Sequence, residues 1–363
     1  MATAPQSEDV RARLAEAERL DRDGRHTEAI DSLAAAARTG DAEALGRLGR
    51  RLLLGDRAPF LPQQAATMLA DAARAGDAEA AGLTAVLLGG GFYAPQSWRL
   101  ALDYLQLAAQ LGSPSAREQL SILADTDLDS AASQTDDEAH WRRLRERVDL
   151  DAWTGAPAPR SLSQAPRVAA VEGLLTHAAC RWLIGQSGPR LARAEVHDPR
   201  TGATVMGATR TNQVANFTLA ETSLLNLLVQ AKIAAAAGLP IAQMEAFAIL
   251  NYAPGEEASE HFDFLDPSIP AYAEEISALG QRVATALVYL NDDYEGGETA
   301  FPELGLAHRG ETGDVLIFYS TDRSGAPDPR TVHAGRPPTS GEKWVLSQFI
   351  RSKPIAPGAE GLG

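Results

Sequence analysis

A pattern of small residues that returns every 36 residues constrains the fold of this chain more than any other feature. The motif Ala-Arg-Xaa-Gly-Asp-Ala-Glu-Ala surrounds Gly40 and Gly76, and a relaxed copy surrounds Gly112. Three further columns keep the same register: Ala29, Ala65 and Ala101; Leu33, Leu69 and Leu105; Ala37, Ala73 and Ala109. A period in the mid-thirties is typical of helical hairpins that stack and bury their apolar faces on one another. The pattern predicts an α-helical repeat solenoid, with each glycine placed to end a helix in the left-handed conformation.

The composition divides the chain into four segments. Residues 1–150 are rich in Ala, Leu, Arg and Asp and form the predicted repeat domain, whereas residues 151–166 contain three prolines and predict an interdomain linker. Residues 167–355 carry short runs of β-branched and aromatic residues between Gly, Pro and Asp turns, which predict strands, and residues 356–363 are expected to be a flexible tail. Helices followed by many strands indicate an α+β multidomain protein, with a β-sandwich or barrel backed by helices.

Charge and cysteine content exclude several classes of protein. The net charge of −15 argues against unaided nucleic-acid binding, which needs a basic surface. No stretch approaches the roughly 20 apolar residues that span a bilayer, so no membrane partner is expected. Cys180 is the only cysteine and the N-terminus is polar, which together favour a cytoplasmic location. The oligomeric state stays open.

The pentapeptide EHFDF supplies two candidate metal ligands. Side chains alternate along a strand, so His261 and Asp263 are expected to share one face. The pair alone is a weak signal, but His333 follows on another predicted strand and provides a third ligand. Two imidazoles and one carboxylate leave three positions of an octahedral ion open, which suits Fe(II) that binds a chelating cosubstrate and O₂. A structural zinc site would close its fourth position, usually with thiolates.

Lys343 leads into the apolar strand WVLSQFI, where a buried ammonium needs a partner. It follows a turn-rich segment, residues 335–342, that we expect to form an antiparallel hairpin with the strand of His333. Lys343 either reaches solvent from the strand end or binds the distal carboxylate of 2-oxoglutarate (2OG). Alternation along RVATALVYL places Tyr289 on one face with Thr285, so its hydroxyl either enters the barrel or belongs to a core tyrosine.

Residues 167–353 resemble the prolyl 4-hydroxylase branch of the Fe(II)/2OG dioxygenases. The matching segments, in family order, are RTNQVANF, LNYAPGEEASEHFDF, RVATALVYLNDDYEGGETAFPE, GDVLIFYS and RTVHAGRPPTSGEKWVLSQFIR. Residues 24–123 resemble Sel1-like repeats, the relatives of tetratricopeptide repeats. The resemblance implies a double-stranded β-helix, or jelly roll, as the catalytic domain behind the N-terminal solenoid.

The same resemblance implies roles for particular residues. Fe(II) is expected at His261, Asp263 and His333, with the 2OG carboxylate at Lys343. O₂ is the second cosubstrate, and ascorbate is the expected reductant. The cosubstrate pocket is expected to include Tyr252, Tyr289 and Thr299. The substrate groove is expected to include Arg210, Thr211 and Trp344.

The implied reaction is hydroxylation of peptidyl-proline to 4-hydroxyproline, with release of succinate and CO₂. A repeat solenoid suits a protein or peptide partner, because it offers a long concave surface. Two alternatives stay open. The barrel hydroxylates a free amino acid, another side chain or a peptide natural product while the repeats serve oligomerisation, or the chain is a repeat-based adaptor with an inactive barrel.

Overall fold

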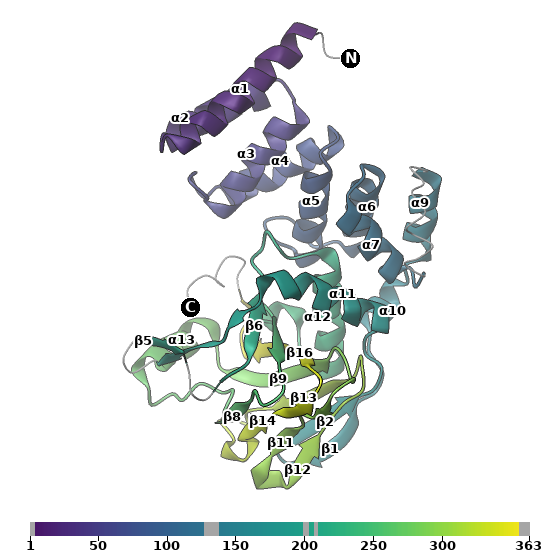
Figure 1. Cartoon of the computed structure of the whole chain (residues 1–363), viewed down its shortest axis with the longest axis vertical. Helices are drawn as coiled ribbons and strands as arrows, with labels where there is room; N and C mark the ends of the chain where they lie inside the picture. Colours follow the sequence, from purple (N-terminus) through teal and green to yellow (C-terminus); the bar gives the residue numbers. More distant parts are fainter. Residues whose placement is uncertain (1–3, 127–137, 199–202, 207–209, 356–363) are drawn as a thin grey trace. The chain divides into compact units, whose positions relative to one another are not determined.

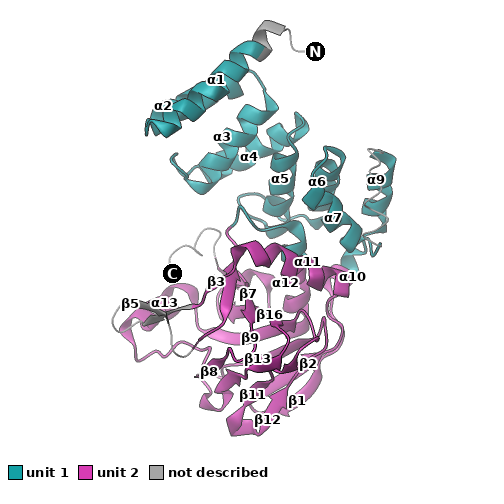
Figure 2. Cartoon of the chain, in the orientation of Figure 1, with its two compact units in different colours: residues 1–151, 219–228 teal, residues 152–218, 229–363 magenta. Residues whose placement is uncertain are grey.

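The computed structural model describes residues 4–126, 138–198, 203–206 and 210–355. The chain forms two compact units (Figure 1 and Figure 2). The first comprises residues 1–151 together with residues 219–228, and the second comprises the remainder. The expected tail, residues 356–363, lies outside the described residues. Among the described residues, no helix has the length and apolar character needed to cross a membrane.

The first unit is built from helical hairpins. They are α2 (His26–Ala37) with α3 (Ala42–Leu54), α4 (Pro62–Arg74) with α5 (Ala78–Gly90), and α6 (Trp98–Gln110) with α7 (Pro114–Leu123). Each hairpin begins 36 residues after the one before it, as the sequence period predicts. Around them lie α1 (Ala4–Arg22), α9 (Glu138–Arg147) and α10 (Leu150–Thr154), the last of which crosses into the second unit.

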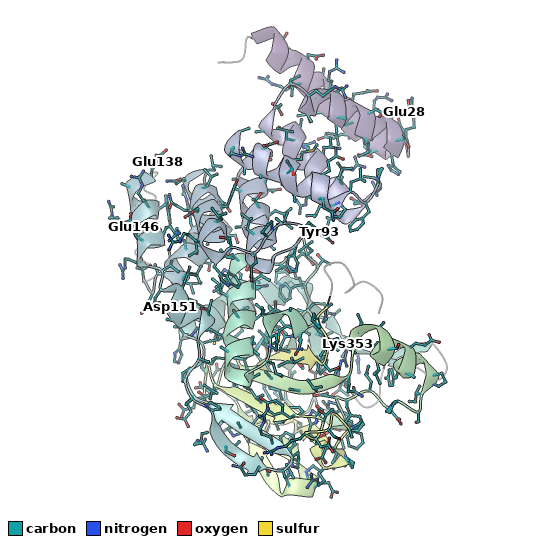
Figure 3. All side chains as sticks on the ribbon, turned by 180° about the vertical axis from the view of Figure 1, so that it is seen from behind. Glu28, Tyr93, Glu138, Glu146, Asp151 and Lys353 are labelled. Atoms are coloured by element: carbon teal, nitrogen blue, oxygen red, sulfur yellow. The ribbon has the colours of Figure 1, made fainter. Side chains whose placement is uncertain are left out.

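The repeated columns explain why these helices form and stack. Ala29, Ala65 and Ala101 are completely buried, so neighbouring helices approach closely at each of them. Gly40, Gly76 and Gly112 adopt positive φ angles of 80°, 109° and 96°. The residue after each glycine caps the next helix through its side chain: Asp41, Asp77 and Ser113. Charged residues such as Glu28 and Glu146 lie on the outer surfaces of the helices (Figure 3). The predicted solenoid is confirmed.

Two segments depart from the expected boundaries. Residues 151–166 are not a plain linker, because β1 (Arg160–Gln164) pairs with β2 (Arg167–Val171) at the edge of the large sheet. An edge strand tolerates the polar sequence RSLSQ, which lacks the apolar alternation by which a strand is recognised in a sequence. Residues 219–228 belong to the first unit, although they were expected in the second. There, the backbone N–H of Leu225 donates to Gln119 Oε1 at 3.2 Å.

The described part of the second unit contains two main antiparallel sheets, of eight and four strands, besides the two-stranded pairs β10-β15 and β4-β5. The larger has the order β1-β2-β13-β9-β16-β7-β6-β3, and the smaller has the order β12-β11-β14-β8. Its core strands are β7 (Ala248–Tyr252), β8 (Ala258–His261), β9 (Arg282–Tyr289), β11 (Thr299–Phe301), β12 (Leu306–His308), β13 (Val315–Tyr319), β14 (His333–Gly335) and β16 (Lys343–Arg351). Along the chain these strands pass back and forth between the two sheets, which is the jelly-roll arrangement that the resemblance implies.

Short elements complete the second unit. The strands are β3 (Ala192–Arg193), β4 (Glu195–Asp198), β5 (Ala203–Met206), β6 (Gln213–Asn216), β10 (Glu295–Gly296) and β15 (Pro338–Ser340). The helices are α11 (His177–Ser187), η1 (Gly188–Arg190), α12 (Leu224–Ala237), η2 (Ile241–Gln243), α13 (Pro270–Leu279), η3 (Pro302–Leu304) and η4 (Pro329–Thr331). Helix α12 begins in the first unit and ends in the second.

The expected hairpin between the strands of His333 and Lys343 is wrong. β14 lies in the smaller sheet and β16 in the larger, and the intervening β15 pairs with β10. Lys343 therefore faces Tyr252 of β7 in register. An antiparallel return is the simplest connection between two nearby strands, but in this jelly roll the chain crosses from the smaller sheet to the larger one between β14 and β16. The core between the sheets is apolar and includes the fully buried Phe301 and Phe318.

Candidate metal centre and adjoining pocket

The three predicted ligands converge at one end of the smaller sheet. His261 is the last residue of β8 and pairs directly with His333, the first residue of β14. Asp263 lies two residues beyond the end of β8, so the strand is shorter than predicted although the two side chains do converge. One ligand atom from each residue lies within 4.8 Å of the other two. Asp263 and His333 are buried and His261 is partly buried.

Hydrogen bonds set the orientation of both imidazoles. Nδ1 of His261 donates to Ser259 O at 2.7 Å, and Nδ1 of His333 donates to Thr331 O at 3.1 Å. In each case the acceptor is the carbonyl two residues earlier. Each ring therefore presents its Nε2 lone pair to the centre, as metal-binding histidines do when the other nitrogen is held by a carbonyl. The guanidinium of Arg210 donates to His261 Nε2 at 3.3 Å, which agrees with this tautomer.

The electrostatics of the cluster favour a cation. Burial and the neighbouring His333 lower the pKa of His261 to about 4, so its ring is neutral at pH 7. Burial opposes ionisation of Asp263, but the two histidines and the hydroxyl of Thr285 outweigh it and lower the pKa of that carboxyl. The Asp263 oxygens lie 3.6 Å from His261 Nε2 and 3.5 Å from His333 Nε2. A cation between the Asp263 carboxylate and the two Nε2 atoms would lie close to all three groups and be attracted to the carboxylate charge.

The donor set fits a divalent first-row metal. Two imidazoles and one carboxylate form a 2-His-1-carboxylate triad, the set that suits Fe(II) with open coordination positions. The pocket in front of the triad has an empty volume of about 440 Å³. Tyr252, Thr299 and Lys343 line this pocket together with the three ligands.

Lys343 is a buried ammonium at the same pocket. Its side chain is 3% exposed, and among the described residues it makes one hydrogen bond, from Nζ to Gly297 O at 2.7 Å. The Nζ atom lies 5.4 Å and 5.7 Å from the ring centroids of Tyr252 and Tyr289. Burial lowers the pKa of Lys343 to about 8, with Glu298 opposing the shift. An ammonium in this setting has two further N–H donors for a carboxylate.

Two hydroxyl-bearing residues, Thr299 and Tyr252, line the same pocket as the ammonium. Thr299 lines the pocket, and the hydroxyl of Tyr289 lies behind it, 3.2 Å from Thr299 Oγ1 and bonded to His308 O. Burial raises the pKa of Tyr252 to about 12 and raises that of Tyr289 further. Both phenols are therefore protonated at neutral pH, and Tyr289 donates its proton to His308 O at 3.3 Å. Tyr289 does not line the pocket: it is fully buried and its hydroxyl is paired with Thr299 and His308 O, as in the core-tyrosine alternative, so its role at the cosubstrate stays a prediction.

The wall that the larger sheet contributes to the pocket includes residues that sequence reasoning missed. Leu250, Leu287, Ser347 and Phe349 line it. The two on β16 lie four and six residues beyond Lys343, so strand alternation from the lysine was the signal that would have found them. This wall is largely apolar, in contrast to the polar end around Lys343.

The three predicted substrate contacts differ in their position relative to the pocket. Arg210 lines the pocket. Thr211 and Trp344 do not line it: the Thr211 hydroxyl pairs with the backbone of Glu257, and Trp344 lies on the face of β16 opposite Lys343. Alternation along the strand requires this placement of Trp344, because adjacent residues point to opposite faces.

Comparison with known proteins adds a family to this geometry. Residues 247–351, which contain all three ligands and Lys343, match the 2OG-Fe(II) oxygenase superfamily. The chain is 31% identical over 213 residues to prolyl 4-hydroxylase 1 of Arabidopsis thaliana, covering 55% of this chain and 74% of the plant protein. It is 30% identical over 188 residues to prolyl 4-hydroxylase subunit alpha-1 of Rattus norvegicus, covering 52% of this chain but 35% of the rat subunit. The solved structure of a viral collagen prolyl hydroxylase from Paramecium Bursaria Chlorella virus-1 aligns with 51% of this chain and 96% of its own, at 23% identity and a TM-score of 0.39.

Proposed function

The chain belongs to the prolyl 4-hydroxylase family of the 2OG-Fe(II) oxygenases, and we therefore propose that it hydroxylates a proline residue in a protein or peptide. It is a 2OG-dependent dioxygenase whose cofactor and cosubstrates are Fe(II), 2OG and O₂. The proposed product is 4-hydroxyproline, with succinate and CO₂ as coproducts. Ascorbate is the proposed reductant that restores Fe(II).

One observation carries the proposal more than any other. A 2-His-1-carboxylate cluster and a buried lysine line the same pocket, which joins a metal site to an anchor for a dicarboxylate. Burying an ammonium is costly unless a partner compensates for it. The far carboxylate of 2OG is a partner of the right charge for Lys343, in the pocket that Thr299 and Tyr252 also line.

The protein's own groups have separable tasks in this proposal. When bound, Fe(II) and 2OG supply an oxidant strong enough for an unactivated C–H bond. His261, Asp263 and His333 would hold the metal, a donor set that suits Fe(II) with open coordination positions. Lys343 binds and orients the cosubstrate through its ammonium, which must be protonated for this task.

The apolar wall has the task of positioning the substrate. Leu250, Leu287 and Phe349 offer a surface on which a pyrrolidine ring can pack, and they keep water from the reacting C–H bond. Arg210 carries a guanidinium at this pocket, suited to donate hydrogen bonds to a backbone carbonyl of a bound peptide. The helical repeats are proposed to bind the protein that contains this peptide.

Incubation of the full chain with Fe(II), 2OG, O₂ and ascorbate tests the proposal. Proline-containing peptides are added as a panel, succinate is followed over time, and mass spectrometry locates the gain of one oxygen. We expect peptide-dependent succinate together with oxidised proline. Peptide-dependent succinate with oxygen on another residue would contradict the prolyl assignment, and the Asp263→Ala variant serves as the inactive control.

A further inference from the structure

Strand β9 lies behind the carboxylate ligand and touches it directly. The hydroxyl of Thr285 donates to Asp263 Oδ2 at 2.7 Å. Both side chains are buried, at 1% and 5% exposure, so water does not compete for this bond. A carboxylate has two oxygens that can bind a metal, and a hydrogen bond to one of them fixes the plane of the group and weakens that oxygen as a ligand.

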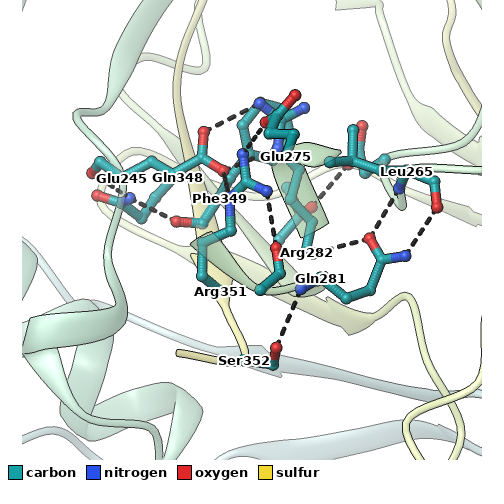
Figure 4. A network of polar contacts seen from close by, with 12 residues as sticks. Glu245, Leu265, Glu275, Gln281, Arg282, Gln348, Phe349, Arg351 and Ser352 are labelled. Atoms are coloured by element: carbon teal, nitrogen blue, oxygen red, sulfur yellow. Dashed lines mark hydrogen bonds and ion pairs between the residues drawn. The ribbon is translucent and has the colours of Figure 1, made fainter. Parts of the chain in front are cut away.

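A second contact from the start of β9 holds the backbone beyond the ligand. Gln281 precedes Arg282, the first residue of the strand, and its side-chain amide binds both backbone groups of Leu265. Oε1 accepts from Leu265 N at 2.8 Å, and Nε2 donates to Leu265 O at 2.7 Å (Figure 4). A neighbouring strand would make the same pair of bonds. A single side chain thus replaces a strand for the segment that follows Asp263.

Gln281 is itself held firmly. Its Oε1 also accepts from Arg282 N at 2.8 Å, and its own backbone exchanges two hydrogen bonds with Ser352. Arg282 forms a bidentate pair with Glu245, and Arg351 binds the same carboxylate (Figure 4). Bidentate, mostly buried arginine pairs are geometrically specific. The base from which Gln281 reaches Leu265 therefore has little freedom.

The position of Asp263 in the fold explains why such support is needed. Its two partner ligands are strand residues, paired with each other across β8 and β14. Asp263 lies past the end of β8, where the ladder no longer fixes the backbone. We propose that Thr285 and Gln281 are positioning residues for the metal site: Thr285 orients the carboxylate of Asp263, and Gln281 fixes the backbone two residues beyond it. This inference rests on the proposed metal role of Asp263.

Metal affinity in the absence of 2OG and substrate tests the inference without reference to turnover. Metal-free full-length protein is titrated with Co(II), and both the affinity and the visible spectrum of the bound ion are recorded. The variants are Thr285→Val, which keeps the shape and removes the hydroxyl, Thr285→Ser, which restores it, and Gln281→Leu. Thr84→Val and Gln119→Leu are matched controls, since each removes a buried, hydrogen-bonded side chain of the same type from the repeat unit.

We expect Thr285→Val and Gln281→Leu to weaken Co(II) binding by about 10- to 100-fold, the usual effect of losing a group that orients a ligand. Their Co(II) spectra should change, Thr285→Ser should bind nearly as wild type, and both controls should be unchanged. Wild-type affinity and spectrum in Thr285→Val would overturn the inference, even if that variant unfolds at a lower temperature. The judgement rests on Thr285→Val if Gln281→Leu does not fold.

The wild type and Asp263→Ala separate this inference from the metal assignment. If the wild type binds Co(II) and Asp263→Ala does not, the metal site is upheld. The Thr285→Val result then decides the positioning role alone. A wild-type chain that binds no Co(II) overturns the metal site and the positioning role together.

Discussion

Replacement of Lys343 by methionine has two consequences of opposite sign. The ammonium is buried and has a single hydrogen-bonding partner among the described residues, Gly297 O. Its proposed second partner is the far carboxylate of 2OG. Truncating one member of a buried, hydrogen-bonded charge pair costs about 2–5 kcal/mol of binding free energy. At about 1.4 kcal/mol per tenfold, the affinity for 2OG should fall roughly 30-fold to several thousand-fold.

The same substitution should stabilise the ligand-free protein. The pKa of Lys343 is lowered by burial from 10.5 to about 8, so at neutral pH the charged form is less favourable in the fold than in the unfolded chain. At about 1.36 kcal/mol per pH unit this cost is up to about 3 kcal/mol. Losing the hydrogen bond to Gly297 O offsets about 1–2 kcal/mol. The free energy of unfolding of Lys343→Met should therefore rise by about 1–2 kcal/mol.

Linkage gives this stability effect a pH signature. Between pH 8 and 10.5 the folded wild type binds fewer protons than the unfolded chain, so its free energy of unfolding rises with pH across that window. Lys343→Met should lack this rise, and Lys353→Met, which changes an exposed lysine, should keep it. Denaturant unfolding of metal-free protein and calorimetric titration with 2OG measure the two effects. Unchanged affinity for 2OG together with unchanged or lower stability would refute the role given to Lys343.

Three further outcomes concern pH, the metal and the repeats. Because binding needs the ammonium of Lys343, the affinity for 2OG should not change with the titration of Lys343 below pH 8 and should fall by up to about tenfold per pH unit above it. A 2OG titration on both sides of pH 8 checks this, and Lys343→Met should lose the pH dependence. Asp263→Ala should abolish turnover and weaken metal binding while the metal-free protein still unfolds cooperatively, and wild-type succinate formation would contradict the ligand assignment. Deletion of residues 1–150 should expose the buried leucines of residues 224–228, whose burial stabilises the fold by about 1.5–3 kcal/mol each, so the shortened chain should aggregate. A soluble product that unfolds cooperatively would contradict the placement of that segment in the first unit.

The sequence was most informative where a periodic pattern and a chemical requirement coincide. The 36-residue columns located the helices of the repeats because small residues are needed wherever two helices approach closely. His261, Asp263 and His333 were identifiable because few combinations of residues bind a metal and leave coordination positions open. Lys343 stood out because a lysine inside an apolar strand needs a partner.

Long-range pairing was beyond the reach of the same patterns. Alternation along β16 places Lys343, Ser347 and Phe349 on one face, yet it does not tell which sheet the strand joins, so the hairpin expected after His333 was wrong. Residues 160–164 are polar because they form an edge strand, which resembles a linker in composition. Helix α12 is apolar on most of its surface, so its sequence does not reveal that its first turn packs in the repeat unit.

The fate of the two oxygen atoms of O₂ tests the central claim most directly. The full chain is incubated with Fe(II), 2OG, a responsive proline peptide and isotope-labelled O₂, with Asp263→Ala as the control. A dioxygenase of this family should place one labelled atom in succinate and the other in hydroxyproline, in equal amounts, and the control should form neither. Labelled succinate with unlabelled peptide, or no succinate at all from the wild-type chain, would contradict peptidyl-proline hydroxylation at this site.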